Sequence, residues 1–199
     1  MTTLILVRHA PHMLQGKSLV GRTDGIGLSP EGRALLGQLA ERFAGAEVDA
    51  VLCSPLERTR QTAAAIAGRL GIEVEVAPEL NEIDYGDWTG RTFAEVEHEP
   101  RWIAWNTFRS GTRLPGAETM IEIQARVLRL VERLRERYPH GRVVLVSHGD
   151  PIRAVLLHFL GMSTDFIHRL EVDPGSVSIL AVGDAGPCLL KLNDSGHLF

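Results

Sequence analysis

Short apolar runs alternate along the chain with longer segments of helical periodicity. Continuous runs rich in branched residues at 3–7, 48–53 and 142–147 predict strands whose two faces are both buried. The alternation of apolar and acidic side chains at 72–76 indicates a half-exposed strand. Two further apolar runs, at 176–182 and 187–192, have the pattern of closing strands.

Four segments between these runs predict helices. They are 29–43, 54–70, 118–138 and 151–160. Ser29-Pro30-Glu31 is a typical helix start, with an N-cap serine, proline at the first helical position and an acid in the first turn. The alternation predicts an α/β fold, a three-layer sandwich with a mainly parallel central sheet covered by helices on both faces. We expect a single domain over 1–199, because no linker or repeat interrupts the pattern.

Composition narrows the class of protein. The chain has 199 residues, a formal net charge of −4 and two cysteines. Two cysteines cannot build a disulfide framework, so we expect a reducing, cytoplasmic location. No apolar run approaches the length of a membrane span or of a signal-peptide core, so we expect no membrane partner. The mild acidity argues against nucleic acid as a partner.

The predicted sheet brings distant residues to one edge. In parallel sheets, binding sites lie beyond the carboxyl ends of the strands. Arg8-His9 ends the first strand, Ser54 ends the second with Arg58 shortly after it, and His148-Gly149 follows the third. Two imidazoles and two guanidiniums therefore converge there.

This set of side chains suits a phosphoryl group. Arginine offers a fixed fork of donors that matches phosphate oxygens. A neutral histidine can attack phosphorus and form a covalent intermediate, and the remaining cations stabilise charge in the transition state. The leaving oxygen then needs a proton from an acid within hydrogen-bond reach. Spacing alone does not select that acid among the 25 Asp and Glu residues.

Four segments resemble the histidine phosphatase superfamily, which has the phosphoglycerate mutase-like fold. They are LVRHA at 6–10, SPLERTRQTA at 54–63, LNEIDYGDWTG at 80–90 and VSHG at 146–149. The resemblance implies that His9 is the nucleophile and that Glu82 is the proton donor, although Glu79 and Asp84 are close enough in sequence to compete for that role. It also implies a phosphate pocket, formed by Arg8, Arg58 and His148 with the Gly149 backbone, to which Gln15 adds a donor. It implies no metal and no cofactor.

The chain departs from the family pattern beside the nucleophile. Ala10 stands where the family has glycine, a residue that adopts positive φ more freely. Pro11-His12 replaces a pair common in mutase-type members, and the interval between Glu82 and His148 leaves modest room for a closing insertion. We therefore expect a metal-independent phosphatase that acts on small anionic phosphomonoesters. A cofactor-dependent mutase-type phosphotransferase and a non-catalytic phosphate-binding regulatory domain are the alternatives.

Charge is unevenly distributed along residues 79–116. Residues 79–99 contain seven acids and one arginine, whereas 100–116 contain three arginines and no acid. From this we hypothesise a basic, aromatic lid over 98–117 that selects the substrate. Its contact residues would be Trp102, Trp105, Arg109 and Arg113. The spacing of the aromatic residues equally fits the packed face of a helix.

Overall fold

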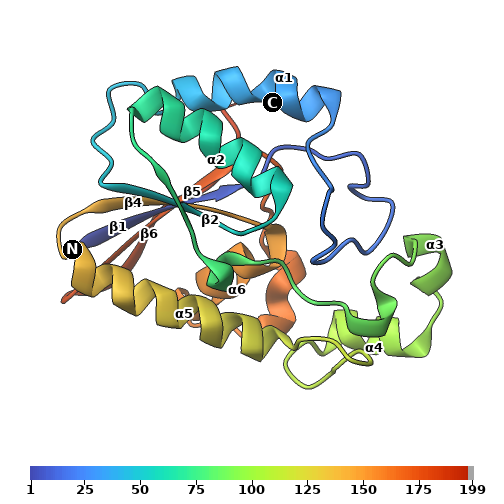
Figure 1. Ribbon diagram of the computed structural model, residues 1–199. Coiled ribbons are helices and arrows are strands. Elements are labelled where there is room, and N and C mark those ends of the chain that lie inside the picture. The colour runs from blue at the N-terminus through green and yellow to red at the C-terminus, as the bar shows by residue number, and fades with distance from the viewer. Residues whose placement is uncertain (197–199) are drawn as a thin grey trace.

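Within residues 1–196, which the computed structural model describes, six strands form one sheet in the order β3-β2-β4-β1-β5-β6 (Figure 1). The strands are β1 Thr2–Arg8, β2 Ala50–Cys53, β3 Val74–Val76, β4 Arg142–Ser147, β5 Val177–Gly183 and β6 Gly186–Asp194. The α-helices are α1 Pro30–Glu41, α2 Glu57–Leu70, α3 Phe93–Val96, α4 Pro100–Thr107, α5 Met120–Arg137 and α6 Gly149–Phe159. Three 3-10 helices complete the elements: η1 Pro78–Leu80, η2 Gly86–Trp88 and η3 Thr164–Arg169.

The sheet is mainly parallel, which confirms the predicted fold class. Strands β3, β2, β4 and β1 run in the same direction, β5 pairs antiparallel with β1 at one side, and β6 pairs antiparallel with β5. Helices α1 and α2 cover one face of the sheet, and α5 and α6 cover the other (Figure 1). None of the described helices is long and apolar enough to cross a membrane.

Coverage on both faces explains the continuous apolar runs. In β1, Leu4 and Leu6 belong to the core cluster under α5 and α6, whereas Ile5 and Val7 belong to the cluster under α1 and α2. Because successive side chains of a strand point to opposite faces, every position in the run must be apolar. The strand β4 divides its side chains between the two clusters in the same way.

Local capping accounts for the helix starts. The Ser29 hydroxyl accepts the Gly32 amide and caps α1, as predicted. Thr119 and Glu122 form a reciprocal capping box at the start of α5. Helix α2 begins at Glu57 rather than at residue 54, and its N-cap Leu56 makes no side-chain hydrogen bond. The Ser54 amide instead donates to the Val146 carbonyl at 3.1 Å, so Ser54 extends the strand pairing.

The carboxyl edge of the parallel strands is held in register by backbone pairing. Arg8 lies opposite Ser147, and the His9 amide donates to the Ser147 carbonyl at 3.0 Å. The ends of β1, β2 and β4 therefore lie side by side. This register carries the residues that follow each strand into a single site.

Candidate active site

A cavity of about 110 Å³ lies at this edge. Its lining combines the end of β1, the start of α2, the loop before α1, and residues between η1 and the start of α3. The lining residues are Arg8, His9, His12, Gln15, Gly16, Ser18, Val20, Gly21, Arg58, Glu82, Tyr85 and Phe93. Five predicted site residues are thus brought together, although they are spread over more than seventy positions of the sequence.

His9 is held as a neutral imidazole. Its ring is 2% exposed, and Nδ1 lies 2.8 Å from the Ala10 carbonyl oxygen. A carbonyl only accepts, so Nδ1 carries the proton and Nε2 keeps its lone pair. Burial lowers the His9 pKa well below its ordinary value, and the charges of Arg58 and Arg8 lower it further. At neutral pH the ring is therefore uncharged, and Nε2 carries a lone pair that could attack an electrophile.

Ala10 fits this backbone without strain. Among the described residues, Asn193 is the one non-glycine position with a positive φ, so Ala10 does not need the left-handed region. Ala10 is fully buried, and its amide donates to the Thr62 hydroxyl at 3.1 Å. Alanine in place of the family glycine therefore causes no backbone strain at position 10.

Two arginines, Arg58 buried and Arg8 partly buried, line the cavity with His9. Arg58 is 1% exposed, and its Nη2 donates to the Gly21 carbonyl at 2.8 Å. Arg8 Nη1 donates to the Val172 carbonyl at 2.6 Å. The Nε of Arg8 and both Nε and Nη1 of Arg58 are buried with no hydrogen-bond partner among the described residues. Buried charged donors without a partner are costly, so their concentration beside a histidine indicates an anion-binding site.

His148 approaches His9 from the end of β4. The two ring centroids are 5.1 Å apart, and the His148 ring is fully buried. Its Nε2 lies 2.7 Å from the Ser54 hydroxyl, which also contacts the Thr59 hydroxyl at 2.7 Å. Its Nδ1 is buried and has no partner in the described part of the chain. Burial lowers the His148 pKa well below its ordinary value, with further lowering by His9 and the arginines.

Glu82 is the acid that reaches the cavity. Burial and, secondly, the nearby charge of Asp150 together raise its pKa to about 7, against the opposing effects of the Ile83 amide and Arg58. Its Oε1 accepts the Ile83 amide at 2.9 Å. Of the two competing acids, Glu79 pairs with Arg133 on the surface, and Asp84 is 44% exposed. The geometry therefore favours Glu82 over both.

Gln15 and Gly149 occupy different places around the pocket. Gln15 lines the cavity, and its Oε1 is buried without a partner among residues 1–196. Gly149 does not line the cavity but lies directly behind Arg8. A Cβ at Gly149 would be 3.5 Å from Arg8 Cζ and 3.0 Å from Arg153 Nη1. Glycine there allows the two guanidiniums to approach the start of α6.

His12 lines the cavity, although no motif in the sequence marked it as a site residue. Its ring centroid is 5.3 Å from that of His9, and its Nδ1 accepts the Leu14 amide at 3.3 Å, which leaves the proton on Nε2. Burial, with Arg58 and Arg8, lowers its pKa to about 4. Its position three residues after His9 was the available signal. Tyr85 and Phe93, also missed, line the cavity as well.

The aromatic residues of the hypothesised lid pack inward instead. Trp105 is fully buried, stacks on Trp102 at 5.0 Å and meets the edge of Tyr85 at 5.8 Å. Trp102 in turn stacks on Trp88 at 6.2 Å. Neither Trp102 nor Trp105 lines the cavity. The packed helix face was therefore the better interpretation of their spacing, because α4 needs an apolar side against the segment that carries Glu82.

The two lid arginines also lie outside the cavity lining. Arg109 is 3% exposed; it pairs with Asp150 at 3.2 Å and lies over the Trp105 ring at 3.2 Å. Arg113 pairs with Glu122 at 2.7 Å on the surface. Both guanidiniums pair with acids of other segments, so two of the three positive charges counted in the sequence are balanced in the folded chain.

This pairing predicts unequal effects of two alanine substitutions. Arg109→Ala leaves Asp150 without its closest cation and removes the stacking on Trp105, so we expect unfolding to become easier by about 3 kcal/mol. Arg113→Ala, the matched surface control, should cost at most about 1 kcal/mol. Denaturant unfolding of both variants measures the difference. Equal stabilities would mean that the Arg109 pair contributes no more than an exposed one.

The arrangement as a whole can hold and attack a phosphoryl group. It presents a neutral nucleophilic nitrogen, unpartnered cationic donors around it and a carboxyl group whose pKa lies near neutrality. Within residues 1–196, no group of three or more His, Cys, Asp or Glu side chains is arranged to hold a metal ion.

Comparison with known proteins gives a match to one family over most of the chain. The model of the histidine phosphatase superfamily, branch 1, matches residues 4–195. Phosphoserine phosphatase 1 of Hydrogenobacter thermophilus is 32% identical, over 100% of this chain and 95% of the relative.

Solved structures resemble the chain over its whole length. A mutant phosphoserine phosphatase of Entamoeba histolytica, in complex with phosphoserine, has 27% identity and a TM-score of 0.89, with 100% of both chains covered. A mycobacterial glucosyl-3-phosphoglycerate phosphatase has 26% identity and a TM-score of 0.87, covering 97% of this chain and 99% of its own. The chain therefore belongs to branch 1 of the histidine phosphatase superfamily.

Proposed function

We propose that this protein is a metal-independent phosphatase that hydrolyses small phosphomonoesters through a phosphohistidine on His9. One observation carries the proposal: the neutral His9 ring, with Nε2 unprotonated, lies among buried arginine donors that have no partner in the described chain. A phosphoryl dianion supplies the acceptors that these donors need. Family membership supports the same class of reaction.

In the first step, the His9 Nε2 lone pair attacks phosphorus and the bond to the ester oxygen breaks. Arg8 and Arg58 bind the equatorial oxygens and stabilise their charge in the transition state. His148 adds a third donor if the Ser54 hydroxyl donates to its Nε2, which leaves the proton on Nδ1. Glu82, as the neutral acid, gives its proton to the departing oxygen.

In the second step, the Glu82 carboxylate takes a proton from water, and the hydroxide oxygen attacks the phosphohistidine. The nitrogen–phosphorus bond breaks, inorganic phosphate leaves and the His9 lone pair is restored. A pKa of about 7 lets Glu82 serve as acid in one step and as base in the other at neutral pH.

We infer a small, anionic substrate. The cavity is only about 110 Å³, and its wall adds a neutral His12 donor to the arginines. The relatives named above are phosphatases of phosphoserine and of glucosyl-3-phosphoglycerate. Phosphate esters of small carboxylic acids are therefore the first compounds to test.

A substrate panel assayed in EDTA tests the proposal. We expect release of inorganic phosphate from at least one small phosphomonoester among phosphoserine, phosphoglycerates, sugar phosphates, nucleotides and phosphorylated cofactor precursors. A parallel assay follows isomerisation of 3-phosphoglycerate in the presence of 2,3-bisphosphoglycerate. Isomerisation faster than phosphate release would identify a mutase, and phosphate binding without turnover of any ester would identify a regulatory domain. Loss of activity in EDTA would contradict the metal-independent reaction.

A further inference from the structure

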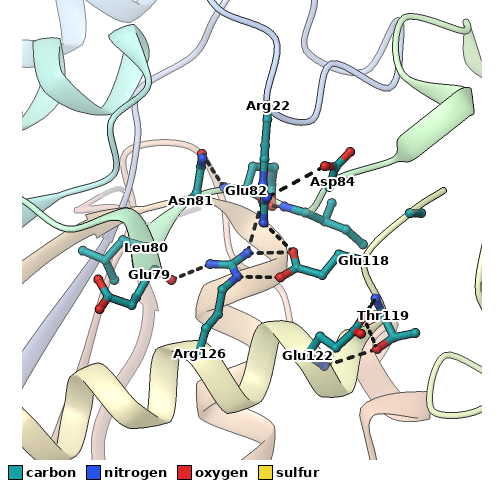
Figure 2. A network of polar contacts seen from close by, with 12 residues as sticks. Arg22, Glu79, Leu80, Asn81, Glu82, Asp84, Glu118, Thr119, Glu122 and Arg126 are labelled. Carbon is teal, nitrogen blue, oxygen red and sulfur yellow. Dashed lines mark hydrogen bonds and ion pairs between the residues drawn. The ribbon is translucent and has the colours of Figure 1, made fainter.

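Two arginines from separate segments donate to the main-chain carbonyl of Glu82. Arg22 comes from the loop before α1, and its Nε lies 2.9 Å from the Glu82 oxygen. Arg126 comes from α5, and its Nη2 lies 3.2 Å from the same oxygen. One carbonyl oxygen has two lone pairs, so these donors use its whole capacity. Figure 2 shows both side chains directed at this point.

The carboxylate of Glu118 joins the two arginines. Its Oε2 accepts Arg22 Nη2 at 2.8 Å and Arg126 Nη2 at 3.0 Å, and its Oε1 accepts Arg126 Nε at 2.8 Å (Figure 2). The Glu118 and Arg126 side chains are only 13% and 11% exposed. Without the carboxylate, two like charges would face each other at close range. We call Arg22, Glu118 and Arg126 the Glu82 clamp.

The clamp also links the acid to the phosphate pocket. Gly21, next to Arg22, accepts Arg58 Nη2 at 2.8 Å through its carbonyl. A Cβ at Gly21 would be 3.0 Å from both the Ile83 carbonyl and the Tyr85 ring, so the loop lies directly on the segment that carries Glu82. Gly21 thus bonds to Arg58 of the phosphate pocket, and its neighbour Arg22 bonds to the main chain of Glu82.

Little else holds the Glu82 side chain in place. Its hydrogen bond within the described chain is to the adjacent Ile83 amide at 2.9 Å, so the carboxyl group follows the main chain. We propose that Arg22, Glu118 and Arg126 are positioning residues that fix the Glu82 main chain and so present its carboxyl group to the leaving oxygen. This inference rests on the proposed function, in which Glu82 is the acid.

The readout is the ratio of kcat/KM for an alkyl phosphate to that for p-nitrophenyl phosphate. An alkoxide must be protonated as it leaves, whereas nitrophenolate needs little protonation, so a misplaced acid lowers the ratio. A general loss of structure lowers both values together. We expect Arg22→Lys and Glu118→Gln to lower the ratio by roughly 10- to 100-fold, the effect of displacing a catalytic group by about 1 Å.

Arg133→Lys is the matched control. Arg133 also projects from α5 toward the same segment, but it pairs with the Glu79 side chain and is 55% exposed. The same type of substitution there should leave the ratio unchanged. Thermal unfolding of each variant identifies any that fails to fold, and Glu118→Gln provides the result if Arg22→Lys does not fold.

Double variants decide whether the clamp acts through Glu82. Adding Arg22→Lys to Glu82→Gln should lower the ratio no further, because the acid is already gone. Equal losses on both esters, no change in the clamp variants, or an additional loss in the double variant would each overturn the clamp inference. If Glu82→Gln itself leaves the ratio unchanged, then the proposed role of Glu82 fails and the inference with it. If Glu82→Gln lowers the ratio but both clamp variants do not, only the inference fails.

Discussion

Replacement of His9 by alanine is expected to lower kcat/KM for p-nitrophenyl phosphate by more than about 10⁴-fold. Loss of a covalent nucleophile costs this much, because water must then attack the ester directly. The buried Nε2 of His9 is the nucleophilic atom in the proposed mechanism. Steady-state assays over a range of enzyme concentrations measure the residual rate. Activity within tenfold of the natural protein would exclude His9 as the nucleophile.

Two controls separate loss of chemistry from loss of the pocket. His9→Ala keeps Arg8 and Arg58, so it should still bind inorganic phosphate in a calorimetric titration. The natural protein, denatured in alkali during turnover of a labelled ester, should retain label on His9, and the variant should retain none. Label on another residue of the variant would point to a different acceptor.

Glu82→Gln is expected to lower kcat/KM for an alkyl phosphate by about 10²- to 10⁴-fold, and that for an aryl phosphate by much less. Glutamine retains the shape and an oxygen for the Ile83 amide, but it carries no acidic proton. Equal slowing of both esters would argue that Glu82 is not the proton donor. Glu132→Gln is the matched control, because Glu132 is 59% exposed on α5, pairs with Arg135 and does not line the cavity.

The pH dependence provides a separate test of the same residue. Burial raises the pKa of Glu82 to about 7, so the acid form predominates below that pH and is lost above it. For an alkyl phosphate, kcat/KM should therefore fall about tenfold per unit as the pH rises beyond about 7. Glu82→Gln should abolish this descending limb and keep the rise near pH 6 that belongs to the substrate phosphate. A variant that retains the descending limb would assign it to another group.

The fold was predictable because its pattern is local. Continuous apolar runs at β1 and β4 require helices on both faces of the sheet. The N-cap Ser29, followed by Pro30, marks the start of α1. Family resemblance added the roles proposed for His9, Arg8, Arg58 and His148, and the structure brings all four to one edge.

The charge balance of residues 100–116 could not be predicted from the local sequence. The sequence showed three arginines without an acid between 100 and 116, but it did not show that Asp150 and Glu122 would face two of them. Those acids come from segments that fold against α4 and the loop after it. Charge balance depends on contacts between segments, which a count along the chain does not contain.

The sequence by itself determined the layer architecture, the edge of the sheet where the site lies and the identity of the residues after each strand. Only the tertiary structure decided which acid reaches the cavity, which nitrogen of His9 is unprotonated, and that His12 belongs to the site. These features arise from burial and from hydrogen-bond partners distant in sequence, such as the two arginines on the Glu82 carbonyl. Desolvation and pairing set a pKa or orient a ring only after the chain has folded.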